Sequence, residues 1–178
     1  MELAPFTPYM SKPTPESRQA VAHQIVNGSA ALTEQIIAGL VEIIAKEGPT
    51  LSTRLLSLYA KKGGMAKLTN VAKRRFVMAL NKAIQDKTIS MEFDTTSEHK
   101  IALLWLPSMK RVVVREYGNR GFEEIPASEL SEVMFELAAE TTEEKTELYQ
   151  HIAELYGLTH LPKSALARLD FVYEDCIG

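Results

Sequence analysis

The stretch that most constrains the fold runs from residue 51 to residue 107, where two helical patterns are followed by two strand patterns. The first predicted helix covers about 51–62 and ends at Gly63-Gly64. Glycine readily takes up the positive φ that closes a helix. The second predicted helix covers about 71–87. We therefore expect two helices joined by a tight turn that contains glycine.

One side of the second helix is predicted to be buried and the other side to face a partner. Its cap is Thr69 or Asn70, whose side-chain oxygen can accept a hydrogen bond from an unpaired amide of the first turn. Lys73, Arg74 and Asn81 fall on the polar side, so a basic face stays available for binding. The apolar side, at helical spacing, consists of Ala72, Phe76, Ala79, Leu80, Ala83 and Ile84.

Two strand patterns follow this helix. Residues 89–93 alternate apolar and polar side chains with a period of two, and residues 101–106 form a short apolar run before Pro107. The polar segment 94–99 between them is typical of a hairpin tip in water. Helix, turn, helix and hairpin in this order predict an α+β fold, a winged helix whose wing is the hairpin.

The residues before this motif predict an arm and two more helices. Four prolines among residues 1–15 favour an extended arm, and Thr14 with Pro15 is typical of a helix start. Helices are expected at about 14–27 and 30–46, and the apolar stripe of the second has to be buried. That stripe consists of Ile36, Ile37, Leu40, Val41 and Ile44.

The residues after the motif predict a strand and three helices. Residues 112–114 are all valine and are a candidate for a third strand of the wing sheet. The helices are expected at about 126–140, 142–156 and 163–175, with a Thr141–Glu144 capping box before the second and Gly157 after it. Their apolar stripes are Leu130, Val133, Met134 and Leu137; Leu148, Ile152 and Leu155; and Leu166, Leu169 and Val172.

These patterns divide the chain into three parts. We expect a proline-rich arm at 1–15, an N-terminal helical extension with the winged helix at 16–117, and an acidic three-helix subdomain at 118–178. Between residues 51 and 90 nine basic residues accompany one acidic residue, whereas from 121 onward thirteen acidic residues accompany three basic ones. Because exposed charges act over about 8 Å at physiological salt, this local balance counts for more than the formal net charge of −3.

A series of motifs resembles that of a known module. The motifs are Ile43-Ile44-Ala45-Lys46-Glu47-Gly48-Pro49, Gly63-Gly64, the basic helix, Trp105-Leu106-Pro107, Val113-Val114-Arg115 and Glu124-Ile125-Pro126-Ala127-Ser128-Glu129-Leu130. In this order they resemble an uncharacterised winged-helix-like module at the C-terminal end of large bacterial proteins with superfamily 1 helicase-type and nuclease-type domains. The likeness covers roughly residues 19–177.

The resemblance implies an accessory or regulatory DNA-binding subunit of bacterial DNA-processing or defence machinery. Here the module stands alone, which leaves open whether it serves a helicase- or nuclease-type protein as a partner in trans. The chain departs from the module just after the glycine turn, where Met65-Ala66-Lys67 replaces the basic residue that is common there.

The basic helix is the strongest functional signal in the residues themselves. In helix–turn–helix proteins the second helix enters the major groove, while flanking lysines and arginines neutralise phosphates. The competing interpretation is a solvated basic face on a winged helix that serves as a protein-interaction adaptor. For double-stranded DNA we expect contacts from Arg54, Lys61, Lys62, Lys67, Asn70, Lys73, Arg74, Arg75, Asn81, Lys82, His99 and Lys100.

Catalytic chemistry has weaker support. The sequence Glu-His-Lys at 98–100, with Asp86 or Asp94, matches half of a metal-dependent nuclease motif. This is a remote alternative, because short patterns recur by chance and a polar hairpin tip is a poor frame for a rigid metal site. The four histidines lack metal-ligand spacing, and no histidine lies near Cys176 in the sequence. We expect a non-enzymatic protein with no catalytic residue, metal or cofactor.

The acidic C-terminal helices leave two interpretations open. They are either a solvated surface over a helical core, or a docking surface for a basic partner or for the basic helix of this chain. The sequence shows neither a signal peptide nor an apolar stretch long enough to cross a membrane, which favours the cytoplasm. Whether the chain forms an oligomer is left open by the sequence. The single cysteine excludes a disulfide within the chain.

Overall fold

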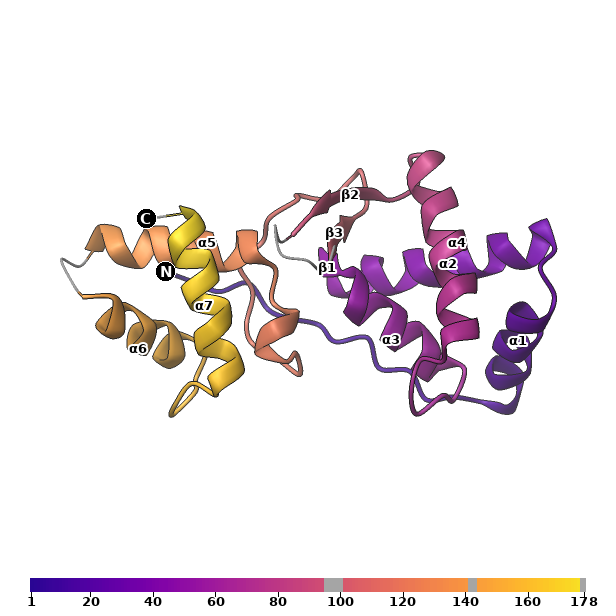
Figure 1. Ribbon diagram of the computed structural model, residues 1–178, viewed down its shortest axis with the longest axis horizontal. Coiled ribbons are helices and arrows are strands. Elements are labelled where there is room, and N and C mark those ends of the chain that lie inside the picture. Colours follow the sequence, from indigo (N-terminus) through magenta and orange to yellow (C-terminus); the bar gives the residue numbers. More distant parts are fainter. Residues whose placement is uncertain (95–100, 141–143, 177–178) are drawn as a thin grey trace. The chain divides into compact units, whose positions relative to one another are not determined.

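The computed structural model describes residues 1–94, 101–140 and 144–176. The chain divides into two compact units (Figure 1). The central unit is Pro8–Arg111, and the terminal unit combines Met1–Thr7 with Val112–Gly178. The division therefore lies at 111/112 instead of the expected 117/118, and the first seven residues belong with the C-terminal part of the chain.

In the described part of the chain, the central unit combines four helices with a three-stranded antiparallel sheet (Figure 1). β3 lies between the other two strands, where Leu51 is paired with Leu103 and Met91 with Leu104. Both expected helices of the basic segment and both strands of the expected hairpin are present. The elements are α1 (Pro15–Val26), α2 (Ala30–Glu47), β1 (Thr50–Leu51), α3 (Ser52–Lys62), α4 (Asn70–Gln85), β2 (Ser90–Phe93) and β3 (Ala102–Trp105).

Local sequence explains where these helices begin and end. Thr14 caps α1 by accepting a hydrogen bond from an amide of its first turn (3.1 Å), and Pro15 occupies the first helical position. Thr69 caps α4 in the same way. Gly64, in the turn between α3 and α4, has a φ of 74°, a conformation that a side chain would strain. The caps and the glycine turn predicted from the sequence are confirmed.

The helices of the central unit share one apolar core. Tyr59 of α3 packs edge-on against Phe76 of α4, with ring centroids 4.9 Å apart. The Tyr59 hydroxyl donates a 2.7 Å hydrogen bond to Oε1 of Gln24, a buried residue of α1. The buried side chains of Gln24 and Val21 therefore hold α1 against the core of this unit. This explains how a helix with so weak an apolar stripe packs here.

The predicted strand at 112–114 is wrong. These residues lie in none of the described strands, and the third strand of the sheet is β1, which precedes α3. The Ala4 amide donates to the Val114 carbonyl (3.0 Å), and the Ala4 carbonyl accepts from the Glu116 amide (2.9 Å). The end of the valine run therefore bonds with the N-terminal segment, next to an isolated bridge between Ala4 and Arg115, instead of joining the sheet.

The terminal unit is helical in the residues that the structure describes. Its elements are the 3-10 helix η1 (Phe122–Glu124), α5 (Ala127–Glu140), α6 (Lys145–Leu155) and α7 (Lys163–Cys176). α5 packs against both α6 and α7. The three expected helices are confirmed, and Gly157 follows α6 with a φ of 69°. No described helix of either unit is long and apolar enough to cross a membrane.

Two local predictions for these helices, a buried Leu166 and the capping box before α6, are not confirmed. Leu166, expected in the buried stripe of α7, is 40% exposed, and its neighbour Ala165 is fully buried instead. This shift by one position rotates the buried face of the first turn and leaves a leucine at the surface. The expected capping box lies partly outside the described residues because it involves Thr141.

Buried charges join the first residues of the chain to the terminal unit. Oε2 of Glu129 accepts hydrogen bonds from Nη2 of Arg115 (2.6 Å) and Nη1 of Arg120 (3.0 Å), and all three residues are buried. The Arg120 guanidinium lies over the Phe6 ring, and its Cζ is 4.6 Å from the ring centroid. Residues 1–7 of the expected arm therefore pack as part of this unit.

Candidate nucleic-acid interface

The basic face of α4 is exposed, and its apolar face holds it in place. Ala72, Phe76, Ala79 and Ala83 are fully buried, as the helical spacing predicted. The exposed polar residues expected to contact DNA are Asn70, Lys73, Arg74 and Asn81 on α4, with Lys61 at the end of α3 and Lys67 in the turn. Six of the predicted contact residues are therefore accessible around one helix.

Three of these residues come together at the first two turns of α4. Asn70, Lys73 and Arg74 line a shallow hollow of about 370 Å³, together with Val77. The first amides of a helix carry a partial positive charge that favours anions. Two cationic side chains beside that helix end make this hollow suited to a phosphate group.

Arg54 was predicted to contact DNA, and this prediction is wrong. Its side chain is 5% exposed and forms an ion pair with Glu47, whose side chain is 1% exposed. Nε donates to Oε2 at 2.7 Å and Nη2 donates to Oε1 at 2.8 Å. Because Arg54 is buried and paired with Glu47 at the end of α2, its charge is not accessible to DNA.

Arg75 also points away from the basic face. Its Nε donates a 3.3 Å hydrogen bond to the carbonyl of Ile25, at the end of α1. The guanidinium lies against Gly28, where an added Cβ would come within 2.2 Å of Nη2. Arg75 thus connects α4 to the segment between α1 and α2, and its role as a DNA contact is not supported.

Lys62 and Lys82 are partly neutralised by acids of α2 and by Asp86, which follows α4. Lys62 Nζ lies 2.6 Å from Oε2 of Glu42, and Lys82 Nζ lies 3.2 Å from Oε1 of Glu34 and also pairs with Asp86. The hydrogen bond to Asp86 raises the pKa of the Lys82 ammonium, so this residue stays charged. Both lysines contribute less net charge to the interface than their sequence positions suggested.

The tip of the hairpin lies outside the described residues, and with it the expected contacts of His99 and Lys100 and the remote nuclease motif at 98–100. Asp86, one of the carboxylates considered for that motif, is paired with Lys82. Among the described residues there is no group of three or more histidine, cysteine, aspartate or glutamate side chains that could hold a metal ion.

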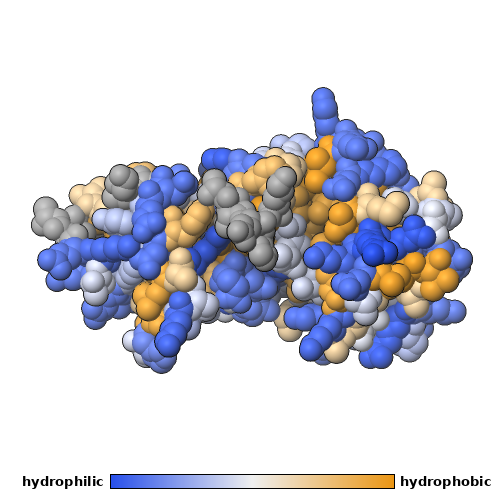
Figure 2. Space-filling view, viewed as in Figure 1, coloured by the Kyte–Doolittle hydropathy of each residue, from blue (hydrophilic) through white to orange (hydrophobic). Residues whose placement is uncertain are grey.

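Sequence analysis did not identify the exposed apolar residues of this surface. Val71 and Met78 on α4 are each 61% exposed, and Phe93 on β2 is 59% exposed. Figure 2 shows apolar and hydrophilic side chains interleaved over the visible face of the central unit. A helical projection would have found the first two, since positions seven apart share one side of a helix.

An apolar groove lies beside the basic face. Its volume is about 460 Å³, and Lys73 and Asn81 line it together with apolar residues of α3, α4 and β2 such as Leu56, Val77 and Met91. The polar side of α4 therefore borders an apolar surface, and either could meet a partner.

Comparisons with known proteins add no identification. None of the protein families, curated proteins or solved structures compared with this chain matches it. The resemblance to the C-terminal modules of helicase- and nuclease-type proteins therefore remains a prediction from the motif series.

Proposed function

We propose that the central unit is a winged-helix module that binds double-stranded DNA through α4. The order of its elements supports this: α2, β1, α3, a glycine turn, α4 and the β2–β3 hairpin, with β1 paired to β3. In this proposal α4 is the recognition helix and the hairpin is the wing. α1 is the N-terminal helical extension, and the terminal unit is the C-terminal three-helix subdomain.

The observation that carries the proposal is the shared exposure of Asn70, Lys73 and Arg74 at the start of α4. Arginine and lysine bind phosphates and guanine edges, and asparagine can hydrogen-bond an adenine edge. Asn81, two to three turns further along the helix, extends the same polar side, while Lys61 and Lys67 supply charge near the turn. In this proposal these six side chains are the donors that contact a duplex.

The wider role follows the resemblance. We infer a non-enzymatic accessory or regulatory subunit of bacterial DNA-processing or defence machinery, working in the cytoplasm with a helicase- or nuclease-type partner. The central unit supplies the DNA contact in this scheme, and chemistry on DNA belongs to the partner.

The test is a salt series of binding to a random-sequence duplex, measured by fluorescence anisotropy on the full chain. The variant Lys73→Ala with Arg74→Ala removes two exposed cations, and we expect weaker binding than in the wild type. The slope of log affinity against log salt should become shallower by about 0.9 for each phosphate that the variant no longer neutralises.

A matched control removes the same charge elsewhere in the central unit. Lys12 and Lys46 are exposed and lie outside α3 and α4. Lys12→Ala with Lys46→Ala should keep a slope close to that of the wild type. Equal slopes for all three proteins, with unchanged unfolding midpoints, would remove α4 from the binding surface.

A second candidate function is a protein-interaction adaptor, and the exposure of Val71 and Met78 favours it. Exposed apolar side chains on a helix are a common element of protein interfaces. An adaptor would show no salt-dependent duplex binding, and replacing these two residues with serine would disrupt its complexes. A DNA-binding module instead loses duplex affinity in the Lys73/Arg74 variant.

A further inference from the structure

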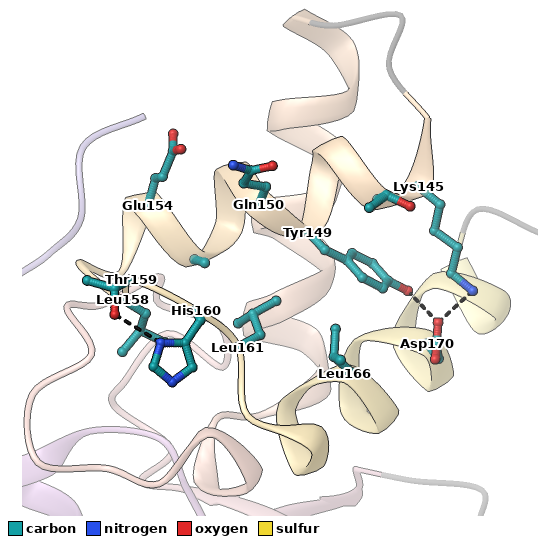
Figure 3. Close-up of a pocket in the computed structure, with 12 residues that line it drawn as sticks. Lys145, Tyr149, Gln150, Glu154, Leu158, Thr159, His160, Leu161, Leu166 and Asp170 are labelled. Carbon is teal, nitrogen blue, oxygen red and sulfur yellow. Dashed lines mark hydrogen bonds and ion pairs between the residues drawn. The ribbon is translucent and has the colours of Figure 1, made fainter.

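A second groove lies in the terminal unit, and it is lined by residues of α6, α7 and the 156–162 connection between them (Figure 3). Its volume is about 570 Å³. It belongs to neither the basic face nor the hairpin, so the proposed DNA-binding function does not use it. Its lining includes Lys145, Tyr149, Glu154, His160, Leu166 and Asp170.

The floor of this groove is apolar. Tyr149 and Ala153 of α6 are buried, while Leu158 and Leu161 of the connection are half-buried. Leu166 of α7 points into the groove (Figure 3) and is 40% exposed. The core of the unit closes around Ala165 at this turn, so Leu166 lies outside that core and lines the groove instead.

One end of the groove carries a fixed carboxylate. Oδ1 of Asp170 lies 2.6 Å from Nζ of Lys145 and accepts a 3.0 Å hydrogen bond from the Tyr149 hydroxyl (Figure 3). The hydrogen bond with Lys145 lowers the pKa of Asp170, and burial raises the pKa of Tyr149. Asp170 is therefore ionised at neutral pH, and because its side chain is 50% exposed it stays accessible to a further cation besides Lys145.

Charge indicates what kind of partner the groove would bind. The charged side chains that line the groove are Lys145, Asp170 and the exposed Glu154, one basic residue against two acidic ones, and the chain from residue 121 onward has thirteen acidic and three basic residues. This balance repels nucleic acids and acidic peptides and attracts basic ones. An apolar floor between two helices, with charge at its rim, fits the apolar side of a third helix.

We propose that the groove between α6 and α7 binds a basic amphipathic helix of a protein partner. Apolar side chains of that helix lie on Tyr149, Leu161 and Leu166, and its lysines or arginines face Glu154 and Asp170. The terminal unit would then recruit a partner protein, independently of how the central unit meets DNA.

The probe is a labelled synthetic peptide of leucine and lysine, about 18 residues long, with leucines repeating every three or four positions on one side. A control peptide has the same composition with its leucines spread around the helix. We expect the full chain to bind the amphipathic peptide more tightly than the control at about 150 mM salt, by fluorescence anisotropy. Equal binding of the two peptides would overturn the proposal, since it would show attraction by charge alone.

The decisive variant is Leu166→Glu, which adds a negative charge and removes the apolar side chain of Leu166 from the groove. Binding by the groove predicts a loss of about ten-fold, whereas attraction by charge alone predicts equal or tighter binding. Phe135→Glu is the matched control, because Phe135 is 53% exposed on α5 and does not line the groove. It should bind like the wild type, and a loss equal to that of Leu166→Glu would overturn the proposal.

The fold of each variant is checked by its unfolding midpoint. If Leu166→Glu lowers the midpoint, Leu166→Ala takes its place, because it shortens the same side chain and adds no charge. It should still weaken the amphipathic peptide several-fold and leave the control peptide unaffected. Unchanged affinity in a folded Leu166→Ala variant would also overturn the proposal.

Discussion

The guanidinium of Arg54 donates two hydrogen bonds to the two carboxylate oxygens of Glu47, at 2.7 and 2.8 Å. Oε1 of the same glutamate also accepts a 2.9 Å hydrogen bond from the Tyr9 amide. The pair connects the last residue of α2 to the first turn of α3. It therefore holds the start of α3 against the end of α2.

Removing Arg54 should destabilise the central unit strongly. Arg54→Ala leaves the buried Glu47 without its counter-charge, which typically costs about 3–5 kcal/mol of unfolding free energy. Denaturant unfolding measures this loss, and Lys61→Ala, at an exposed position of the same helix, should change the free energy by less than about 0.5 kcal/mol. A similarly small effect at both positions would contradict a structural role for the pair.

Arg75 should behave differently from its neighbours on α4. Arg75→Ala removes a hydrogen bond to the Ile25 carbonyl and the packing on Gly28, so the unfolding free energy should fall by about 1 kcal/mol. The salt dependence of duplex binding should stay as in the wild type, because this guanidinium is not on the exposed face. A shallower salt slope in this variant would instead place Arg75 among the residues that contact phosphate.

Gly39 tests how tightly Tyr59 is held. Alanine is the better helix former by about 1 kcal/mol, yet a Cβ at position 39 would lie 2.3 Å from Cε2 of Tyr59. The ring cannot move freely because its hydroxyl is bonded to Gln24 and its edge packs on Phe76. We expect Gly39→Ala to lower the unfolding free energy by about 1–3 kcal/mol.

A double-mutant cycle provides the control for this prediction. Tyr59→Leu removes the ring, so Gly39→Ala should be much less harmful in that background. Equal costs in both backgrounds would show that contact with the ring is not what excludes a side chain at this position.

The stability of the central unit should also fall at alkaline pH. Burial raises the pKa of Tyr59 to about 12 from an ordinary value of 10, so the folded state prefers the neutral phenol. The resulting stabilisation is fully present below pH 10 and is lost as the pH rises through about 12. Unfolding free energies measured across this range should fall less steeply in Tyr59→Phe than in the wild type.

Part of the alkaline effect should persist in that variant. Burial also raises the pKa of Tyr9 in the central unit, and those of Tyr149 and Tyr156 in the terminal unit. Phenolate absorbance of the native protein should show one late-titrating tyrosine fewer after Tyr59→Phe. If the pH dependence and the absorbance titration were both unchanged, Tyr59 would not be the group responsible.

Patterns that depend on neighbours along the chain predicted the fold well. The caps at Thr14 and Thr69, the turn at Gly64 and the buried face around Phe76 follow from local hydrogen bonding and helical spacing. Such signals need no knowledge of distant partners. For the same reason they placed the helices and the hairpin within a few residues of their observed bounds.

Features that depend on distant partners were not predicted. The sequence shows that Arg54 and Arg75 are basic, but only the packing of α2 and α1 against their helices shows that both are engaged. The carbonyl of Val114 likewise accepts a hydrogen bond from the Ala4 amide, more than a hundred residues away. Of the residues expected to contact DNA, those on the outer side of α4 are exposed, as the helical spacing predicted.

The position of Phe6 has a consequence for the order in which a nascent chain can fold. Its amide donates to a carboxylate oxygen of Glu116, 110 residues further along. At a synthesis rate of roughly 5–20 residues per second, the first seven residues wait about 5–20 s for that partner to be made. The central unit, whose residues are contiguous, can close during this interval while the aromatic ring stays in water. Residues 1–7 are thus among the last to reach their folded positions, and substitutions in them affect the stability of the terminal unit.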